Sequence, residues 1–278
     1  APDDREGAAA GDLPGDARVP GGTFLLGSSA DEPFLFDNEK WAHEVNVEPF
    51  SIARAPVTQA AYATFVDEGG YRRREAWSDA GWAWRLAEGA EGPRYWRKEG
   101  STWLRRDFDH WVSLEPHRPV VNVSSHEAEA YCRFAHRRLP TETEWEVAAA
   151  GEPGPSGLLA RRKRRYPWGD EAPTPRRAHL DFRALDAVDV GALPEGDSAF
   201  GCRQMIGNVW EWTSSAFLPY PGFSPDPYRD YSAPWFETHR VVRGGSFATT
   251  RRLVRCAFRN FYEPHRRDPW IGFRTCAP

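Results

Sequence analysis

The chain of 278 residues carries a net charge of −4, has a pI near 6.1 and is 40% hydrophobic. This length and apolar content are typical of a single large mixed domain with its own core. The weak negative charge excludes a general basic field for nucleic acid or for an anionic membrane surface. No apolar stretch reaches the length of about 18 residues that would predict a membrane-spanning helix.

Aromatic and turn-forming residues shape the expected architecture. The chain has 13 Trp, 24 Gly and 24 Pro residues. Gly and Pro interrupt regular elements, whereas each Trp buries a large apolar area and brings one N–H donor. The composition therefore predicts short helices and strands that are joined by long ordered loops.

The start of the chain differs in composition from the rest. Residues 1–18 are polar and rich in Gly, Ala and Asp, and they lack the basic and apolar segments of a signal sequence. We expect a flexible tail, a linker from an upstream domain or a remnant of processing. One domain is predicted to follow, over residues 19–278.

Cysteine usage bears on the cellular compartment. The four cysteines are Cys132, Cys202, Cys256 and Cys276. None forms a CxxC pair, so the spacing does not indicate a structural zinc site. Unpaired thiols in a long chain fit a reduced cytoplasm, which is the predicted location. Two disulfides in a periplasmic or otherwise exported protein are the alternative.

The first predicted elements are two strands and a helix. A turn and a short strand are expected over residues 19–27, and alternating apolar residues predict a second strand over residues 45–50. Thr58 is the expected N-cap of a helix that runs to Val66.

A long ordered insertion is predicted next, over residues 71–118, because this segment is rich in Trp and broken by Gly. Its expected local core consists of tryptophans, namely Trp77, Trp82, Trp84, Trp96, Trp103 and Trp111.

Two further helices have clear start signals. Ser124 with Glu127, and Thr141 with Glu144, form the S/T-x-x-E pattern of a capping box. Residues 151–165 then form a Gly/Pro-rich segment that ends in five basic residues. No interleaved aromatic residues accompany this run, so we interpret it as a solvated surface loop and expect no nucleic-acid partner.

A series of short motifs runs through the whole predicted domain. In order they are Pro20–Phe24, Pro56–Thr58, Pro119–Ser124, Arg138–Glu146, Tyr166–Gly169, Gly207–Trp212, Arg243–Ser246 and Gly272–Arg274. Together they resemble the formylglycine-generating enzyme superfamily, whose members include ergothioneine-type sulfoxide synthases and a pyoverdine-maturation branch. The resemblance implies a compact α+β fold with little regular secondary structure, related to C-type lectin-like domains.

Copper-dependent formylglycine generation is not expected. Members that activate sulfatases hold Cu(I) on two cysteines shortly after the Arg-Gly-Gly-Ser motif, where soft thiolates suit a soft ion. Residues 247–254 of this chain contain no cysteine, and Cys256 stands where the family has a structural position.

Other segments are similar to the iron-dependent sulfoxide synthases of the ergothioneine type. They are Phe36–His43, Gly69–Tyr71 with the following tryptophans, Trp212–Ser215, Tyr220–Phe223, Ser246–Thr249 and Arg259–Tyr262. Those enzymes use O₂ and non-haem Fe(II) to join the sulfur of a thiol to the imidazole carbon of a histidine derivative. The resemblance implies this chemistry, with cysteine, γ-glutamylcysteine or a selenium analogue as the second substrate.

The iron ligands are where the sequence departs from that family. In the family, three histidines with a His-x3-His-x-Glu pattern come from an N-terminal helical-bundle domain, and this chain has neither. None of its eight histidines forms an i, i+4 pair on a predicted helix. We therefore expect a helical-bundle domain upstream or in trans to supply the ligands for Fe(II).

The resemblance also implies positions for the substrates. Arg259, Asn260, Phe261 and Tyr262 match the segment that contacts them, and the Asn260 amide suits a carboxylate or imidazole partner. A satisfied loop Asn with a packing Tyr is the alternative. Tyr220 lies where the family has an active-site tyrosine, whose phenol can donate a proton or hydrogen atom. A surface tyrosine in a Pro-rich turn is the alternative for Tyr220.

Charged side chains allow two further predictions. Four arginines could bind a substrate carboxylate through paired N–H groups, although we expect most of them to form ion pairs with Glu144, Glu146 or Glu211. These arginines are Arg243, Arg255, Arg259 and Arg274. The resemblance implies a structural Ca²⁺ site with oxygen ligands, formed by the side chains of Gln204 and Glu211 and the carbonyls of Gly207 and Val209.

Three functions remain open on the sequence. The first is the substrate-binding part of an iron-dependent sulfoxide synthase. The second is a stand-alone oxidase or tailoring enzyme of the pyoverdine-maturation kind. The third is a non-catalytic ligand-binding module, since the fold does not decide function.

Overall fold

The computed structural model describes residues 10–278. Its α-helices are α1 (Gln59–Asp67), α2 (Asp79–Glu88), α3 (Ser125–Phe134) and α4 (Glu142–Ala150). Its strands are β1 (Asp16–Val19), β2 (Gly22–Leu26), β3 (His43–Val47), β4 (Phe50–Ala53), β5 (Trp96–Glu99), β6 (Thr102–Asp107), β7 (His110–Ser113), β8 (Trp210–Ala216), β9 (Arg240–Arg243), β10 (Arg259–Tyr262) and β11 (Ile271–Gly272). None of these helices exceeds ten residues, which confirms the prediction of short elements joined by long loops.

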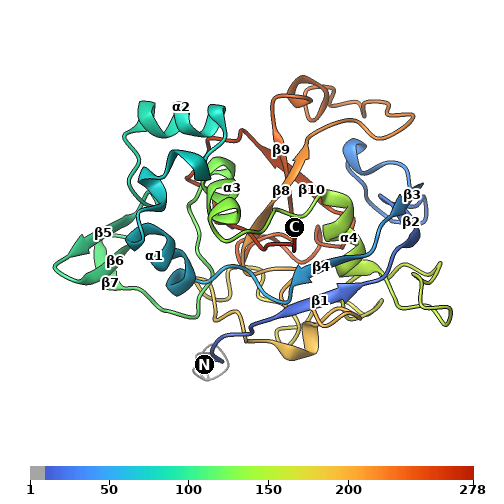
Figure 1. Ribbon diagram of the computed structural model, residues 1–278. Helices are drawn as coiled ribbons and strands as arrows, with labels where there is room; N and C mark the ends of the chain where they lie inside the picture. The colour runs from blue at the N-terminus through green and yellow to red at the C-terminus, as the bar shows by residue number, and fades with distance from the viewer. Residues whose placement is uncertain (1–9) are drawn as a thin grey trace.

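The strands form several small sheets. The largest has the order β10-β9-β8-β11, in which all neighbours are antiparallel except the parallel pair β8–β11. Figure 1 shows β8, β9 and β10 near the centre of the molecule, with α2 and the β5-β6-β7 sheet on one side and β2 and β3 on the other. Strand β10 lies at one edge of its sheet, so one side of it has no strand partner among the described residues.

The ordered domain begins earlier than predicted. Strand β1 pairs antiparallel with β4 from Asp16 to Val19, and Ala17 and Val19 are buried. The last part of the expected flexible segment 1–18 is therefore a strand of the domain, which corrects the predicted boundary. Residues 1–9 lie outside the described residues.

The helix starts follow the local sequence. The Thr58 hydroxyl accepts the N–H of Ala61 at 3.2 Å and caps α1, and both predicted capping boxes are present, at the starts of α3 and α4. A cap stabilises a helix because it satisfies N–H groups that have no partner inside the helix. These three predictions are confirmed.

The insertion is more regular than expected. It contains α2, which Ser78 caps and which ends at Gly89 in the left-handed conformation, and the three-stranded sheet β5-β6-β7. Trp77 is buried, but Trp111 is 37% exposed and does not belong to the core.

Glu127 ties this insertion to the body of the molecule. Its Oε2 accepts the N–H of Ser124 at 2.7 Å in the capping box. Its Oε1 accepts the hydroxyl of Tyr71 at 2.5 Å and an N–H of Arg267 at 2.9 Å. One buried carboxylate thus joins the start of α3, the insertion and the segment after β10.

Arginine–glutamate pairs are buried around the central sheet. Helix α4 contacts β2, β8 and β9, and two of the pairs, Arg243–Glu146 and Arg259–Glu142, join the sheet to α4. The other two are Arg274–Glu211, which joins the segment after β11 to β8, and Arg255–Glu39. The prediction of structural ion pairs is confirmed, although two of the partners, Glu142 and Glu39, differ from those expected.

Gly244 of the Arg-Gly-Gly-Ser motif makes room for α4. It has a φ of +95°, and a Cβ there would lie 2.8 Å from the Met205 carbonyl oxygen and 3.2 Å from the Trp145 ring. Only glycine adopts this backbone conformation without strain at so close an approach. The glycine therefore lets Trp145 pack against the turn after β9.

The basic run of residues 161–165 is largely neutralised. Arg162 pairs with Asp170, Arg164 with Glu152 and Arg165 with Glu32, while Lys163 points inward to the buried carboxylate of Glu146. The predicted solvated loop is thus partly a packed one. Of the described helices, none is long and apolar enough to cross a membrane.

Candidate functional site

The predicted substrate-binding residues lie on β10, but not on one face of it. In register, Arg259 is opposite Arg243, and Asn260 is opposite Val242. Because side chains alternate between the two faces of a strand, Arg259 and Phe261 point one way and Asn260 and Tyr262 the other. The sheet therefore divides the predicted set into two pairs.

Arg259 faces α4 and belongs to the core. It is fully buried, and its guanidinium donates to both carboxylate oxygens of Glu142, at 2.9 and 3.0 Å. Its remaining N–H groups donate to the carbonyl oxygens of Asn38 and Leu218. The prediction that Arg259 binds substrate is wrong, because every edge of this guanidinium is occupied by protein atoms.

Phe261, on the same face as Arg259, lies in an aromatic cluster. Its ring stacks on Phe217 with centroids 4.0 Å apart and meets Tyr231 and His239 edge to face. Phe36 stacks on Tyr231 in turn. The cluster joins β10 to the loop between β8 and β9, so packing accounts for Phe261 in this structure.

Tyr220 is a core residue and not the surface tyrosine of the alternative prediction. It is 6% exposed, and its hydroxyl donates to Glu142 at 3.3 Å. The Arg259 guanidinium lies 4.0 Å from the centre of its ring. Burial raises the pKa of the Tyr220 phenol far above its usual value. To donate a proton or hydrogen atom in catalysis, the Tyr220 hydroxyl would first have to break its hydrogen bond to Glu142.

Asn260 and Tyr262 form the accessible part of the predicted set. Both are partly exposed, and the Asn260 amide nitrogen lies 3.5 Å from the Tyr262 hydroxyl. Asn260 Oδ1 accepts the N–H of Phe261 at 2.9 Å and the amide nitrogen donates to the Tyr262 hydroxyl, so the amide is fixed and its second N–H group has no partner among the described residues. An amide and a phenol side by side can bind an imidazole or a carboxylate.

Charged residues that the sequence did not single out border this pair. Arg240 lies opposite Tyr262 in register, and its guanidinium is 3.4 Å from Glu129 of α3. Burial, followed by the charges of Arg240 and His265, lowers the pKa of His126 to about 4. The antiparallel pairing of β9 with β10 brings Arg240 beside Tyr262. Glu129 and His126 lie on α3, and only the folded structure shows that this helix packs near β10. We call Asn260, Tyr262, Arg240, Glu129 and His126 the polar face of β10.

The described part of the chain does not contain a set of iron ligands. Among residues 10–278, no three His, Cys, Asp or Glu side chains gather into a possible metal site. A non-haem iron centre needs such a set, typically two histidines and a carboxylate or three histidines. The described residues therefore do not fit an iron centre by themselves.

The predicted calcium ligands are also engaged elsewhere. Glu211 accepts from Arg274 with both oxygens, at 2.6 and 2.7 Å, and from the Trp145 ring N–H at 2.9 Å. The Gln204 side-chain oxygen accepts from Asn208 at 2.6 Å. A carboxylate already neutralised by arginine is a poor ligand for a hard cation, so this arrangement does not fit Ca²⁺.

The cysteines do not provide thiolates for copper. All four are buried and unpaired. Burial raises the pKa of Cys202 to about 11 and that of Cys276 to about 12, and raises those of Cys132 and Cys256 further. Neutral thiols are weak metal ligands, which agrees with the absence of a cysteine pair after Ser246.

Comparison with known proteins assigns the chain to a family. The model of the sulfatase-modifying factor enzyme 1-like domain matches residues 3–277. The hercynine oxygenase of Mycolicibacterium thermoresistibile is 48% identical over 257 residues, which cover 90% of this chain and 56% of the relative. The formylglycine-generating enzyme of Streptomyces coelicolor is 32% identical over 288 residues, covering 95% of this chain and 88% of that enzyme.

The solved structure of PvdO from Pseudomonas aeruginosa has the same fold, with a TM-score of 0.63 and 22% identity over 95% of this chain and 94% of that one. The predicted α+β fold of the formylglycine-generating-enzyme type is thereby confirmed. The chain spans little more than half the length of the hercynine oxygenase that it matches. It belongs to the family of sulfatase-modifying factor enzyme 1-like domains.

Proposed function

We propose that this chain is the substrate-binding part of an O₂- and iron-dependent sulfoxide synthase that acts on a histidine derivative, as in ergothioneine-type biosynthesis. The observation that carries the proposal is the 48% identity to a hercynine oxygenase over 90% of the chain. The 32% identity to a formylglycine-generating enzyme is lower, and the chain lacks the cysteine pair after Ser246.

The proposed reaction joins a thiol and an imidazole. One thiol, one imidazole C–H group and one O₂ would give a sulfoxide-linked product and one water, so that the two hydrogens and one oxygen atom leave as water. A selenol would react in the same way. Bound non-haem iron would supply the O₂ chemistry. Its ligands would come from residues outside this chain, in a helical-bundle domain on the same polypeptide or on a partner.

The role of this chain in the proposal is to hold the histidine derivative. The second N–H group of the Asn260 amide would donate to an imidazole nitrogen or a carboxylate, and the Tyr262 hydroxyl, which accepts from the first, would donate to the same ligand. Arg240 would add a positive charge for a carboxylate. Strand β10 holds these groups on a paired element, which keeps their spacing fixed.

Binding of hercynine tests this role directly. We expect saturable binding in a calorimetric titration of the chain and a loss of about tenfold or more in affinity for Asn260→Ala, since one buried hydrogen bond contributes roughly 1–2 kcal/mol. Asn46→Ala is the matched control, because Asn46 is exposed on β3. No binding by the parent chain, or equal binding by Asn260→Ala, contradicts the proposal.

Iron binding tests where the metal is held. We expect an anaerobic Fe(II) titration of the chain to show no tight stoichiometric binding, because no ligand set is present among residues 10–278. Tight binding of one Fe(II) per chain would show that the chain holds its own iron. It would contradict the proposal that the iron ligands come from outside this chain.

A further inference from the structure

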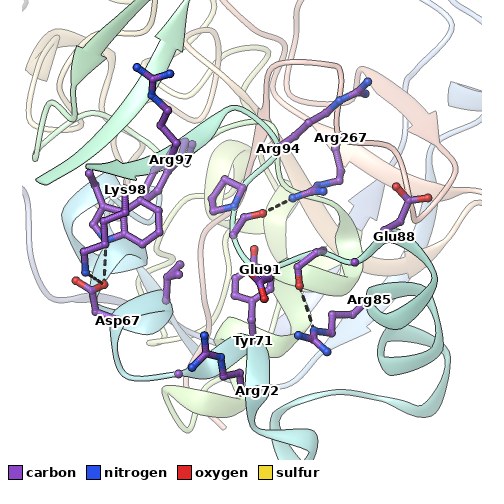
Figure 2. A pocket seen from close by; sticks show the side chains of 18 residues that line it. Asp67, Tyr71, Arg72, Arg85, Glu88, Glu91, Arg94, Arg97, Lys98 and Arg267 are labelled. Carbon is purple, nitrogen blue, oxygen red and sulfur yellow. Dashed lines mark hydrogen bonds and ion pairs between the residues drawn. The ribbon is translucent and has the colours of Figure 1, made fainter. Parts of the chain in front are cut away.

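Two cavities border strand β5 of the insertion, and Trp96 of this strand lines both. The larger has a volume of about 570 Å³, and Figure 2 shows that its labelled side chains are all charged except Tyr71. Several of these charges have partners within the protein, as in the ion pair between Lys98 and Asp67. The smaller cavity is a crevice of about 380 Å³ with a different lining, which includes four aromatic residues. This volume lies within the range of about 300–1,000 Å³ that is common for small-molecule sites.

The crevice lies where the insertion meets the body of the molecule. The insertion contributes residues at the start of β5, at the end of β6 and in the turn after β6. The body contributes the first residue of α1, the segment before α3, the loop before β8 and the segment before β11. The residues concerned are Tyr95, Trp96, Arg105, Arg106, Asp107 and Phe108 of the insertion, and Gln59, Val121, Asn122, Leu185, Asp186, Asp268 and Trp270 of the body.

Phe108 is an unusual residue for its place at the rim of the crevice. It lies in the two-residue turn between β6 and β7 with a φ of +50°, and its side chain is 71% exposed. Such turns favour Asn or Gly, because a bulky side chain disfavours the left-handed conformation. Neither local conformation nor burial therefore accounts for a phenylalanine here, whereas a ring that lines a binding site does.

Two amide side chains offer a donor and an acceptor to the crevice. Gln59 is 3% exposed, and its Oε1 accepts the N–H of Glu115 at 3.0 Å, but its Nε2 has no hydrogen-bond partner among the described residues. Because protein atoms do not fully enclose this nitrogen, its N–H groups are open to the crevice that Gln59 lines. Asn122 Nδ2 donates to the carbonyl oxygens of Asp268 and Pro269, both at 3.1 Å, and Asn122 Oδ1 has no donor among residues 10–278. A nearly buried amide N–H without a partner is unfavourable, and a ligand acceptor would satisfy it.

The charges around the crevice are largely compensated. Arg105 donates to Asp186 at 2.5 Å, and Asp268 accepts from Arg266 at 2.6 Å. The two other charged residues of the lining have opposite signs and are Arg106 and Asp107. Because recognition of an ion depends on an opposite charge that is available to it, a neutral ligand fits this crevice better than an ion.

We propose that this crevice binds a small, uncharged planar ring that carries an amide, either as a carboxamide substituent or as a lactam within the ring. The carbonyl oxygen of the ligand would accept from Gln59 Nε2, and its N–H would donate to Asn122 Oδ1. The ring would lie against the aromatic side chains of the lining, which favour a flat partner. The site is independent of the proposed function, because no residue of the polar face of β10 lines the crevice.

Nicotinamide is a suitable probe, because it combines a flat ring with a carboxamide. We expect it to bind saturably, with a Kd of about 10 mM or tighter, in a ligand-observed NMR titration of the chain. Two matched compounds each lack one feature, since 3-methylpyridine has no amide and cyclohexanecarboxamide has no flat ring. Each is expected to bind about fivefold more weakly or worse. Equal binding of either compound, or no saturable binding of nicotinamide, overturns the proposal.

Variants locate the bound ring. Gln59→Glu keeps the acceptor for the Glu115 N–H but replaces the free donor, and it should weaken nicotinamide binding about tenfold. Phe108→Ala removes an exposed ring at little cost to the fold and should weaken binding about threefold. Phe34→Ala is the matched control, because Phe34 is 53% exposed in the loop between β2 and β3, across the molecule from β6 in Figure 1.

The two crevice variants guard against different failures. Phe108→Ala decides the location by itself if Gln59→Glu does not fold. Parent-like affinity in Phe108→Ala, or a loss of the same size in Phe34→Ala, would show that nicotinamide binds elsewhere and would overturn the assignment of the crevice.

Discussion

The arginines on or beside the central sheet and two arginines of the insertion have opposite surroundings. Arg243, Arg259 and Arg274 are fully buried, and each faces a glutamate. Arg72 and Arg94 are exposed, and neither forms an ion pair with another side chain of residues 10–278. A buried guanidinium without a counter-charge is strongly unfavourable, whereas an exposed one is solvated by water. The buried arginines thus require partners, while the solvated arginines of the insertion do not.

The largest effect is expected when a buried pair of the sheet is broken. Arg274→Met should lower the free energy of unfolding by about 3–5 kcal/mol, because Glu211 would remain buried without its partner. Urea denaturation measures this loss. The control is Arg162→Met, which removes an ion pair whose two side chains are 63% and 59% exposed, and it should change stability by less than about 1 kcal/mol. Similar losses in the two variants would remove the distinction between buried and exposed arginines.

A smaller, pH-dependent effect is expected beside the polar face of β10. Burial, with the charges of Arg240 and His265, lowers the pKa of His126 to about 4 from 6.5. Between these values the unfolded chain takes up a proton that the folded chain does not, so this contribution to stability is present above pH 6.5 and is lost as the pH falls toward 4.

Two variants isolate this titration. From pH 7.5 to pH 5, the parent chain should lose about 1–2 kcal/mol of stability relative to His126→Gln, after allowance for partial solvent screening. His110→Gln is the control, since the His110 side chain is 78% exposed, and it should follow the parent chain. Parallel pH profiles for the parent and His126→Gln would show that folding does not shift the pKa of His126.

The smallest effect on stability is expected at the two exposed arginines of the insertion. The double variant Arg72→Ala/Arg94→Ala should change the free energy of unfolding by less than about 0.5 kcal/mol, as is usual for surface side chains without partners. Thermal denaturation without ligand measures it. A loss of more than about 1 kcal/mol would show that Arg72 and Arg94 stabilise the fold, as the buried arginines do.

Local signals in the sequence predicted local structure well. The caps of α1, α3 and α4 could be predicted because each depends on residues only three positions apart. Helix α2 was missed although Ser78 and Gly89 bound it, because its tryptophans suggested an irregular, locally packed segment. Its place beside α3 depends on contacts that a local pattern does not contain.

The glutamate partners of the buried arginines could not be predicted from local sequence patterns. Glu142 and Glu146 lie one helical turn apart and face the sheet, whereas Glu144 is used by the capping box and by Arg138. Residues four apart on a helix share one face, whereas residues two apart do not. Glu142 and Glu146 therefore pair with arginines, and Glu144 does not share their face. Tyr220 could not be placed in advance, because its burial depends on Glu142 and Arg259, which are distant in the sequence.

The single carboxylate of Glu127 has a consequence for how the molecule opens. It holds the first turn of α3, Tyr71 of the insertion and Arg267 of the C-terminal segment at once. Separating the insertion from the body would therefore also release the cap of α3 and the hydrogen bond from Arg267 to the Gly92 carbonyl oxygen in the loop after α2. The insertion and α3 should thus form one cooperative unit in native-state hydrogen exchange, with their amides becoming unprotected in the same opening event.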